Sequence, residues 1–429
     1  INPQSGGYDA QAEALRKSIV NSPDKLKIVG DVYYISYRGN DSNSGTSKDK
    51  AWRTINAYNE NRWRLKSGDT VLFERGGVYR GTLHLISGVT YGAYGSGPKP
   101  NIYGSVKNYA DEKLWKKSSK NNVWEISVPG LLDVGNIVFD HGKAVGIKRI
   151  KGISELNKDF LFYHDHGKQK IYLYLSKGNP GKLYSDIEFS EKKHVLNGGS
   201  ATNVTIDNLC VMYGGAHGIQ FVSTKDIKIT NCEIGWIGGS IQKGDTQYGN
   251  GIEFWNDCEN ILVENNWVYQ CYDAGITHQG DPGSIQKNVV FRGNLVEYCV
   301  YALEFFLHES EGLMENITYE NNVLRFAGYG FGFDRSYIGA VSLVNGWGHK
   351  HPAVNFNIRN NVFDLSNYYL IVLYYNGPQS IKFNGNTYYQ KGNRVADWSE
   401  RHLRAKSQSE LEKQIAKIES SPKLVKYLG

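Results

Sequence analysis

A short motif that recurs through the second half of this 429-residue chain constrains its fold more than any other feature. In each copy an apolar residue is followed two positions later by Asn or Gly, at Asn208, Asn231, Asn265, Gly293, Asn321, Asn360 and Gly385. Asn and Gly tolerate a left-handed backbone, so the pattern predicts a bend at the same point of every copy. The spacing of roughly 23 to 39 residues fits one coil per copy, with loops of different length on one face.

A second set of segments precedes these bends and alternates as short strands do. The segments are 218–221, 251–254, 275–278 and 302–305. No segment between them has the length and period of a crossover helix, which argues against a doubly wound sheet. We therefore predict an all-β right-handed parallel β-helix, a solenoid with coils about 4.8 Å apart. Its inward column is Ile219, Ile252, Ile276 and Leu303, and the residue after each faces outward.

The rest of the chain is expected to elaborate this solenoid. Residues 1–106 would form an N-terminal cap and the first coils, with an amphipathic helix at 8–20 covering an open end. Residues 107–200 lack the repeat and read as a β-rich insertion. Residues 201–392 would be the coils that carry the active groove, and residues 393–429 a short helical cap.

Composition narrows the classes of protein to consider. Hydrophobic residues make up 40% and charged residues 21%, values that exclude a disordered chain and a coiled coil. No stretch approaches the ~20 apolar residues of a membrane span. The net charge of +6 comes without a dense Lys/Arg run, so nucleic acid is not an expected partner. Because the chain begins at Ile1, we interpret it as a trimmed, secreted product.

The five cysteines are an odd number, so they do not form a complete disulfide framework. Cys271 and Cys299 fall in an inward column of the repeat. We expect thiols stacked in the core, and a bridge between these two is the alternative.

Several motifs in the first half resemble the opening segments of secreted bacterial β-helix carbohydrate-active enzymes. They are Tyr33–Ser36, Gly39–Thr46, Trp52–Ile55, Ser67–Phe73 and Tyr91–Gly95. These enzymes form the pectin-lyase-like superfamily, and the resemblance implies a monomer acting outside a bacterial cell on a polysaccharide. It does not specify the reaction, because the superfamily includes lyases, glycosidases, uronate epimerases and tailspikes. The paired Asp motifs and Gly-His-Gly of polygalacturonases are missing, and 216–218 matches the latter only in part.

Carboxylates on the outward face are the strongest candidates for chemistry. Glu253 and Glu304 follow inward residues, and Asp334 follows Phe333 in what reads as the next coil. Like charges stacked on neighbouring strands are destabilising, so their presence indicates a function. We predict a catalytic group at one groove comprising Glu253, Glu304, Asp334, Arg335 and His278.

Aromatic and polar residues near these carboxylates are predicted to bind the substrate. Trp255 and Phe306 share the outward parity of the two glutamates, and flat rings stack on the apolar faces of pyranoses. The loops 238–250, 280–287 and 307–315 would form the groove walls. The predicted substrate-binding set is Lys243, Tyr248, Trp255, Phe306, His308 and Asp281.

Two mechanisms fit this groove. A polysaccharide lyase would abstract the C5 proton of a uronate whose carboxylate is neutralised by Arg and Lys, or by Ca²⁺ held by Glu253, Glu304 and Asp334. A glycoside hydrolase would use a carboxylate pair as acid and nucleophile or base. Arg335 beside the carboxylates, the basic composition and the lyase-rich superfamily favour β-elimination of an acidic polysaccharide or exopolysaccharide. A non-catalytic, tailspike-like glycan-binding solenoid is the third alternative.

Overall fold

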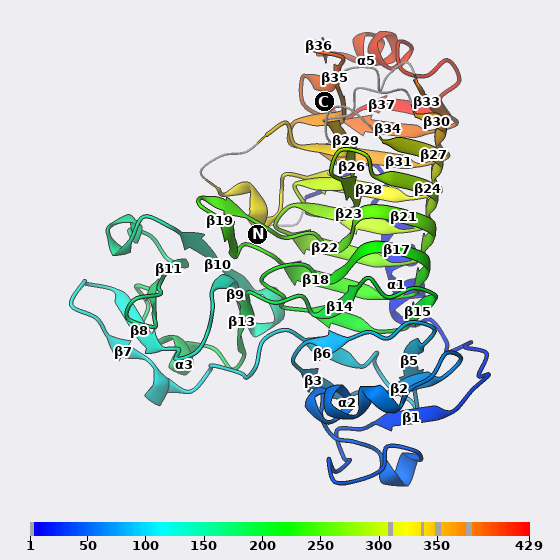
Figure 1. Cartoon of the computed structure of the whole chain (residues 1–429). Coiled ribbons are helices and arrows are strands. Elements are labelled where there is room, and N and C mark those ends of the chain that lie inside the picture. The colour runs from blue at the N-terminus through cyan, green and yellow to red at the C-terminus, as the bar shows by residue number, and fades with distance from the viewer. Residues whose placement is uncertain (1–3, 308–311, 336–338, 348–352, 375–379) are drawn as a thin grey trace.

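The computed structural model describes residues 4–307, 312–335, 339–347, 353–374 and 380–429. The chain winds into stacked coils whose strands pair in parallel from one coil to the next (Figure 1). The larger sheet has 18 strands: β1 (Val32–Ile35), β2 (Thr70–Glu74), β4 (Leu83–His84), β5 (Thr90–Tyr94), β14 (Leu196–Gly199), β15 (Val204–Asp207), β17 (Ile219–Thr230), β21 (Ile252–Glu264), β23 (Ala274–Gly280), β24 (Ile285–Arg292), β26 (Tyr301–Leu307), β27 (Leu313–Glu320), β29 (Ser342–Trp347), β30 (Val354–Arg359), β32 (Tyr369–Leu373), β33 (Ile381–Asn384), β35 (Arg394–Trp398) and β36 (Arg401–Arg404).

A second parallel sheet closes each coil on another side. Its ten strands are β3 (Val78–Arg80), β6 (Asn101–Tyr103), β16 (Cys210–Met212), β18 (Glu233–Ile237), β22 (Trp267–Cys271), β25 (Leu295–Glu297), β28 (Val323–Ala327), β31 (Val362–Ser366), β34 (Thr387–Gln390) and β37 (Leu424–Tyr427). The two sheets enclose one apolar core that runs the length of the solenoid.

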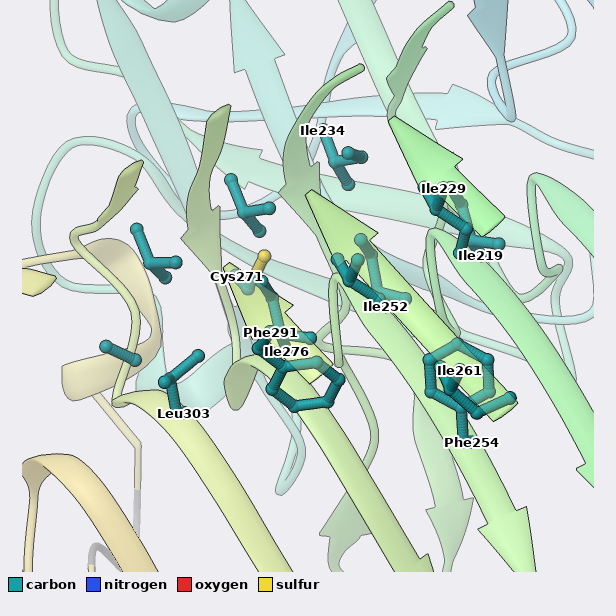
Figure 2. Close-up of a cluster of buried hydrophobic side chains, with 14 of the residues drawn as sticks. Ile219, Ile229, Ile234, Ile252, Phe254, Ile261, Cys271, Ile276, Phe291 and Leu303 are labelled. Carbon is teal, nitrogen blue, oxygen red and sulfur yellow. The ribbon is translucent and has the colours of Figure 1, made fainter. Parts of the chain in front are cut away.

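The predicted inward column is confirmed. Ile219 pairs with Ile252, Ile252 with Ile276, and Ile276 with Leu303, so the four side chains stack in register inside the coils (Figure 2). All five cysteines are buried and free, as the thiol prediction requires.

The predicted bends are confirmed as well, since every member of the Asn/Gly column has a positive φ between 54° and 68°. The following position, which the sequence analysis did not single out, holds a buried ladder of asparagines. Asn294 Oδ1 accepts the backbone N–H of Asn266 at 3.0 Å, and Asn322 does the same for Asn294. The ladder continues through Asn361 and Asn386 and ends on Glu419.

The insertion forms a separate seven-stranded sheet beside the coils (Figure 1). Its strands are β7 (Lys116–Lys117), β8 (Val123–Ser127), β9 (Val134–Phe139), β10 (Ala144–Arg149), β11 (Leu161–Asp165), β12 (Lys170–Tyr174) and β13 (Ile187–Glu191), with α3 (Pro180–Leu183) before the last strand. The chain re-enters the solenoid at β14, which pairs with β4 and β17. The solenoid coil that began in the first hundred residues is thus completed after the insertion.

Helices cover the ends and one side of the solenoid. The helix α2 (Ile55–Asn61) packs Ile55 and Tyr58 into the N-terminal end of the core, and α5 (Gln408–Ile415) packs Leu411 and Ile415 into the C-terminal end. The prediction that the first helix caps an end is wrong. The helix α1 (Asp9–Val20) lies along the side, against β22 and β25, where Ala12 and Ile19 pack with Leu295 and Arg16 pairs with Glu297. Among the described residues, no helix is long and apolar enough to cross a membrane.

Candidate functional site

A cavity of about 480 Å³ lies on the outer face of β17, β21, β23, β26 and β29. Its floor draws on two columns of outward side chains that the parallel register aligns. The first column is Gln220, Glu253, Thr277, Glu304 and Asn345, and the second is Val222, Trp255, Gln279, Phe306 and Trp347. A hairpin of β19 (Ile241–Lys243) and β20 (Thr246–Gln247), with the segment after it, forms one wall. The predicted outward glutamates therefore lie in one cavity.

Glu304 lies at the floor of this cavity and is only 2% exposed. Its Oε1 accepts hydrogen bonds from Asn345 Nδ2 at 3.1 Å and from Trp347 Nε1 at 2.7 Å. Its Oε2 accepts a hydrogen bond from Gln279 Nε2 at 2.6 Å. Because an indole N–H only donates, Oε1 must act as an acceptor. A proton on the neutral carboxyl group therefore sits on Oε2.

Burial raises the pKa of Glu304 to about 8, and the negative charges of Asp273 and Glu253 add to the shift. The hydrogen bonds from Trp347 and Asn345 favour the charged form and oppose it. Glu304 is therefore neutral at pH 7 and able to donate a proton.

Glu253, also in the cavity, is held by a histidine that the sequence analysis had not assigned to the site. His217 Nε2 lies 2.5 Å from Glu253 Oε2. The other ring nitrogen of His217, Nδ1, accepts the backbone N–H of Asn250 at 3.1 Å. The proton of the neutral ring therefore sits on Nε2 and is donated to Glu253. This arrangement suits Glu253 to act as a carboxylate.

A second histidine supports the first. The ring of His194 stacks on that of His217, with centroids 5.1 Å apart and planes 4° apart. His194 Nδ1 accepts the backbone N–H of His217 at 3.3 Å. Burial lowers the pKa of His194 to about 4, with the neighbouring His217 contributing, so His194 is neutral at pH 7. A stack of two imidazoles thus orients one N–H toward Glu253.

A third carboxylate, Asp273, lines the same cavity and forms an ion pair with a residue outside it. Arg335 Nη1 lies 3.1 Å from Asp273 Oδ1, and the guanidinium sits over the Tyr272 ring at 4.0 Å. Arg335 itself lines a neighbouring cavity. The cation therefore partly neutralises Asp273 from outside the site.

Aromatic rings form much of the remaining surface. Phe306 lies between Trp255 and Trp347, with centroid distances of 5.9 Å and 4.1 Å. Tyr248 lies against His217, 5.5 Å between ring centroids. Flat apolar surface beside hydrogen-bonding groups is typical of small-molecule sites, and it matches the alternating faces of a sugar ring.

The prediction that Asp334 stacks beside Glu304 is wrong. Glu304 pairs with Asn345 of β29, so the next coil begins later in the chain than expected. Asp334 is exposed, and it lies 2.9 Å from Arg149 and 3.7 Å from Lys158 of the insertion.

A short 3-10 turn, η6 (Phe331–Phe333), explains the error. Phe331 packs outside the coil against Trp236 and Tyr272, because the insertion covers this face and provides an apolar contact there. The Gly-Phe-Gly-Phe alternation is also typical of a strand, so the local sequence does not distinguish this turn from a strand. For the same reason Arg335 lies outside the groove, so the prediction that it is catalytic is wrong.

The prediction that His278 is catalytic is also wrong. His278 is 0% exposed and pairs with Phe254 on one side and Phe305 on the other, inside the core. Its Nε2 lies 2.7 Å from the Tyr319 hydroxyl, and its Nδ1 contacts Gln286. It lies two residues after the inward Ile276, and strand alternation places it inward too.

The predicted substrate-binding residues divide between the cavity and other surfaces. Tyr248, Trp255 and Phe306 line the cavity. Lys243 is exposed on the hairpin and does not line the cavity. Asp281 lies in the turn after β23, where its backbone N–H donates to Asn256 Oδ1, and it too does not line the cavity. His308 lies outside the described residues.

The predicted Ca²⁺ ligands do not converge. Asp334 lies elsewhere, and both oxygens of Glu304 are engaged by side-chain donors. This set does not fit calcium, which takes six to eight oxygen ligands. In the described part of the chain, one other group, Asp133 with His164 and His166, has metal-ligand spacing. There the buried ammonium of Lys148 already contacts the carboxylate.

Sequence reasoning missed His194, His217, Asp273 and Trp347 as site residues. His217 was noticed only as part of an incomplete motif, although it lies two residues before the inward Ile219. Trp347 ends a strand whose alternation is readable in the sequence. His194 directly follows the insertion, so no repeat register locates it.

Comparison with known proteins supports the fold. The family model of the right-handed β-helix region matches residues 185–338. No curated protein matches the chain significantly. The chain has the right-handed parallel β-helix fold.

Similar solved structures include both hydrolases and a lyase. A glycoside hydrolase aligns over 86% of this chain and 94% of its own, at 10% identity and a TM-score of 0.51. A pectate lyase aligns over 89% and 78%, at 12% identity and a TM-score of 0.47. A family 28 exopolygalacturonase from Yersinia enterocolitica aligns over 88% and 75%, at 14% identity and a TM-score of 0.42. Similarity at these identities shows the fold alone.

Proposed function

We propose that this protein is a glycoside hydrolase in which Glu304 is the general acid and Glu253 the general base. One observation carries the proposal: a buried carboxyl group, whose pKa burial raises, and a histidine-held carboxyl group share one aromatic-lined cavity. Glycosidases require such a pair, one member protonated and one ionised at the working pH.

The proposed reaction follows from the positions of the protons. Glu304 gives its Oε2 proton to the glycosidic oxygen as the bond from that oxygen to C1 breaks. A water molecule attacks C1, and its proton passes to Glu253, which His217 holds in place. The products are a new reducing end and the released alcohol. Glu253 then releases its proton to solvent and Glu304 takes one up, which restores both groups.

The spacing of the pair favours inversion at C1. Glu253 and Glu304 lie two coils apart, since both pair with Thr277 between them. Two strand spacings place their Cα atoms about 10 Å apart, and two side chains that leave the same face in register keep their carboxyl groups nearer to that separation than to about 5 Å. Inverting enzymes keep the two carboxyl groups about 6.5 to 9.5 Å apart to admit the water, whereas retaining enzymes need about 5 to 5.5 Å.

The preference for β-elimination rested on the basic composition, on the lyase-rich superfamily and on Arg335 beside the carboxylates, and the structure removes the last of these. A lyase must neutralise the uronate carboxylate next to the proton it removes. Among the described residues that line the cavity there is no Lys or Arg, and Arg335 is paired with Asp273 behind it. A hydrolase needs no such cation.

The test is a screen of polysaccharides with two readouts, reducing ends and absorbance at about 235 nm. We expect reducing ends without absorbance, and inverted anomers by proton NMR at early times. Rising absorbance would show a lyase, and tight binding without either signal would show a binding solenoid. Both outcomes contradict the proposal.

Variants then assign the roles. Glu304→Gln and Glu253→Gln should each lower kcat by about a hundredfold or more, as expected for loss of a proton-transfer group. Glu259→Gln is the matched control, because Glu259 is exposed on the same strand as Glu253 and lies outside the cavity. Near-normal kcat in both site variants would refute the assignment.

A further inference from the structure

A second cavity of about 230 Å³ lies between the insertion and the coils. The insertion contributes Lys148, Arg149, Lys151 and Glu155, and the coils contribute Asp334 and Arg335. Neither the predicted catalytic groove nor the proposed reaction uses the insertion's side of this cavity.

The two cavities share a wall. Gln247, from the hairpin, lines both of them. The hydroxyl of Tyr272 donates to Gln247 Oε1 at 2.6 Å, and Arg335 lies over the same tyrosine ring. The pair of Asp273 with Arg335 crosses this wall, with the carboxylate in the first cavity and the guanidinium in the second. The cavities are thus one side chain apart, a distance that neighbouring sugars of a chain can span.

The cavities differ in charge. The first holds three carboxyl groups and, among its described residues, no Lys or Arg. The second is lined by four basic and two acidic residues. Lys148, Arg149 and Arg335 are paired with Asp133, Asp334 and Asp273 respectively.

Lys151 is the exception in the second cavity. It is exposed, and it forms no ion pair with any residue that the structure describes. Glu155 accepts the backbone N–H of Lys151 at 2.8 Å. The ammonium is therefore available for an anion that enters the cavity.

We propose that the second cavity is a subsite for an acidic sugar, one whose carboxylate or sulfate contacts Lys151 and Arg149 while a neutral sugar occupies the catalytic cavity. This inference rests on the proposed hydrolase function and names its substrate class: a glycan with an anionic unit near, and not at, the cleaved residue. It also gives the insertion a role in selecting the substrate.

The test uses isothermal titration at low salt with trisaccharides that join one galacturonate, glucuronate or mannuronate unit to two neutral sugars, and with the methyl ester of each as the uncharged match. We expect at least one acid to bind more tightly than its ester. Lys151→Met should weaken the binding of that acid about fivefold to tenfold, the range for loss of one charge-assisted contact, and leave the ester unaffected. Lys116→Met is the matched control, since Lys116 is exposed on the edge strand of the insertion and lines neither cavity.

Two outcomes would overturn the subsite: acids and esters that bind equally, or equal losses in the two lysine variants. Turnover is measured separately, so the two proposals fail independently. Selective acid binding without release of reducing ends keeps the subsite and refutes the hydrolase. Hydrolysis of a glycan without charge discrimination keeps the hydrolase and refutes the subsite.

Discussion

Replacing Glu304 by Gln should make the protein more stable at alkaline pH. The pKa of Glu304 is about 8 in the fold against an ordinary value of 4.5. Between these values the unfolded chain releases the proton and the folded chain keeps it, so stability is full below pH 4.5 and falls as pH rises toward 8. Complete loss of this contribution corresponds to on the order of 5 kcal/mol.

The amide preserves the local contacts. Its oxygen can accept from Asn345 and Trp347 as Oε1 does, and its NH₂ group takes the place of the Oε2 hydroxyl. The amide of Gln279 must turn so that its oxygen faces the new donor. At pH 5 we therefore expect wild type and variant to differ by about 1 kcal/mol or less.

The assay is urea denaturation at half-unit steps from pH 5 to 8.5, followed by fluorescence. The free energy of unfolding of the variant minus that of wild type should grow by several kcal/mol across this range. The same difference for Glu259→Gln should stay flat. A flat difference for Glu304→Gln as well would refute the raised pKa. Wild-type kcat should also fall above about pH 8, as the acid loses its proton.

Three further predictions concern the fold and the metal. Asn265→Ala should lower the free energy of unfolding by about 1 kcal/mol, because residue 265 has a left-handed backbone. Asn294→Ala should lower it by about 2–3 kcal/mol, because the buried N–H of Asn266 and the buried C=O of Val263 lose their partner. Equal losses in urea denaturation would contradict this. Asp133→Asn should lower the free energy of unfolding by about 3–5 kcal/mol, because the buried ammonium of Lys148 then lacks its anionic partner. An unchanged melting temperature would refute this prediction. Exhaustive EDTA should leave turnover intact, because the predicted Ca²⁺ ligands do not converge in the cavity. Loss of turnover that Ca²⁺ restores would contradict this.

Much of the solenoid was predictable because its geometry repeats locally. The Asn/Gly column predicted the positive-φ bend at each of its seven members, and strand alternation predicted the stacked core of Ile219 to Leu303. The side-chain ladder through Asn294 was not predicted, although its letters are visible, because only the coil-to-coil register shows that these amides face one another.

The site was predictable only in part. Strand alternation placed Glu253 and Glu304 on one face of the sheet. It also placed Trp255 and Phe306, two residues further along the same strands, on that face. The same alternation gave a wrong prediction for Asp334, because a turn that packs against the insertion stands where a strand was expected. Charge states were beyond sequence reasoning, because the pKa of Glu304 depends on burial and on Asp273, which comes from another part of the coil.

The sequence by itself determined one bend in each repeat, one stacked column of the core and which two glutamates face outward, since those follow from strand alternation and backbone preference within a few residues. The tertiary structure decided which groups meet. It brought His194 and His217 to Glu253, placed Asp273 near Glu304 and moved Arg335 behind the wall of the cavity. These contacts join residues from different coils, which are separated by loops and an insertion of unequal length. Local sequence preferences do not determine how close such distant segments come.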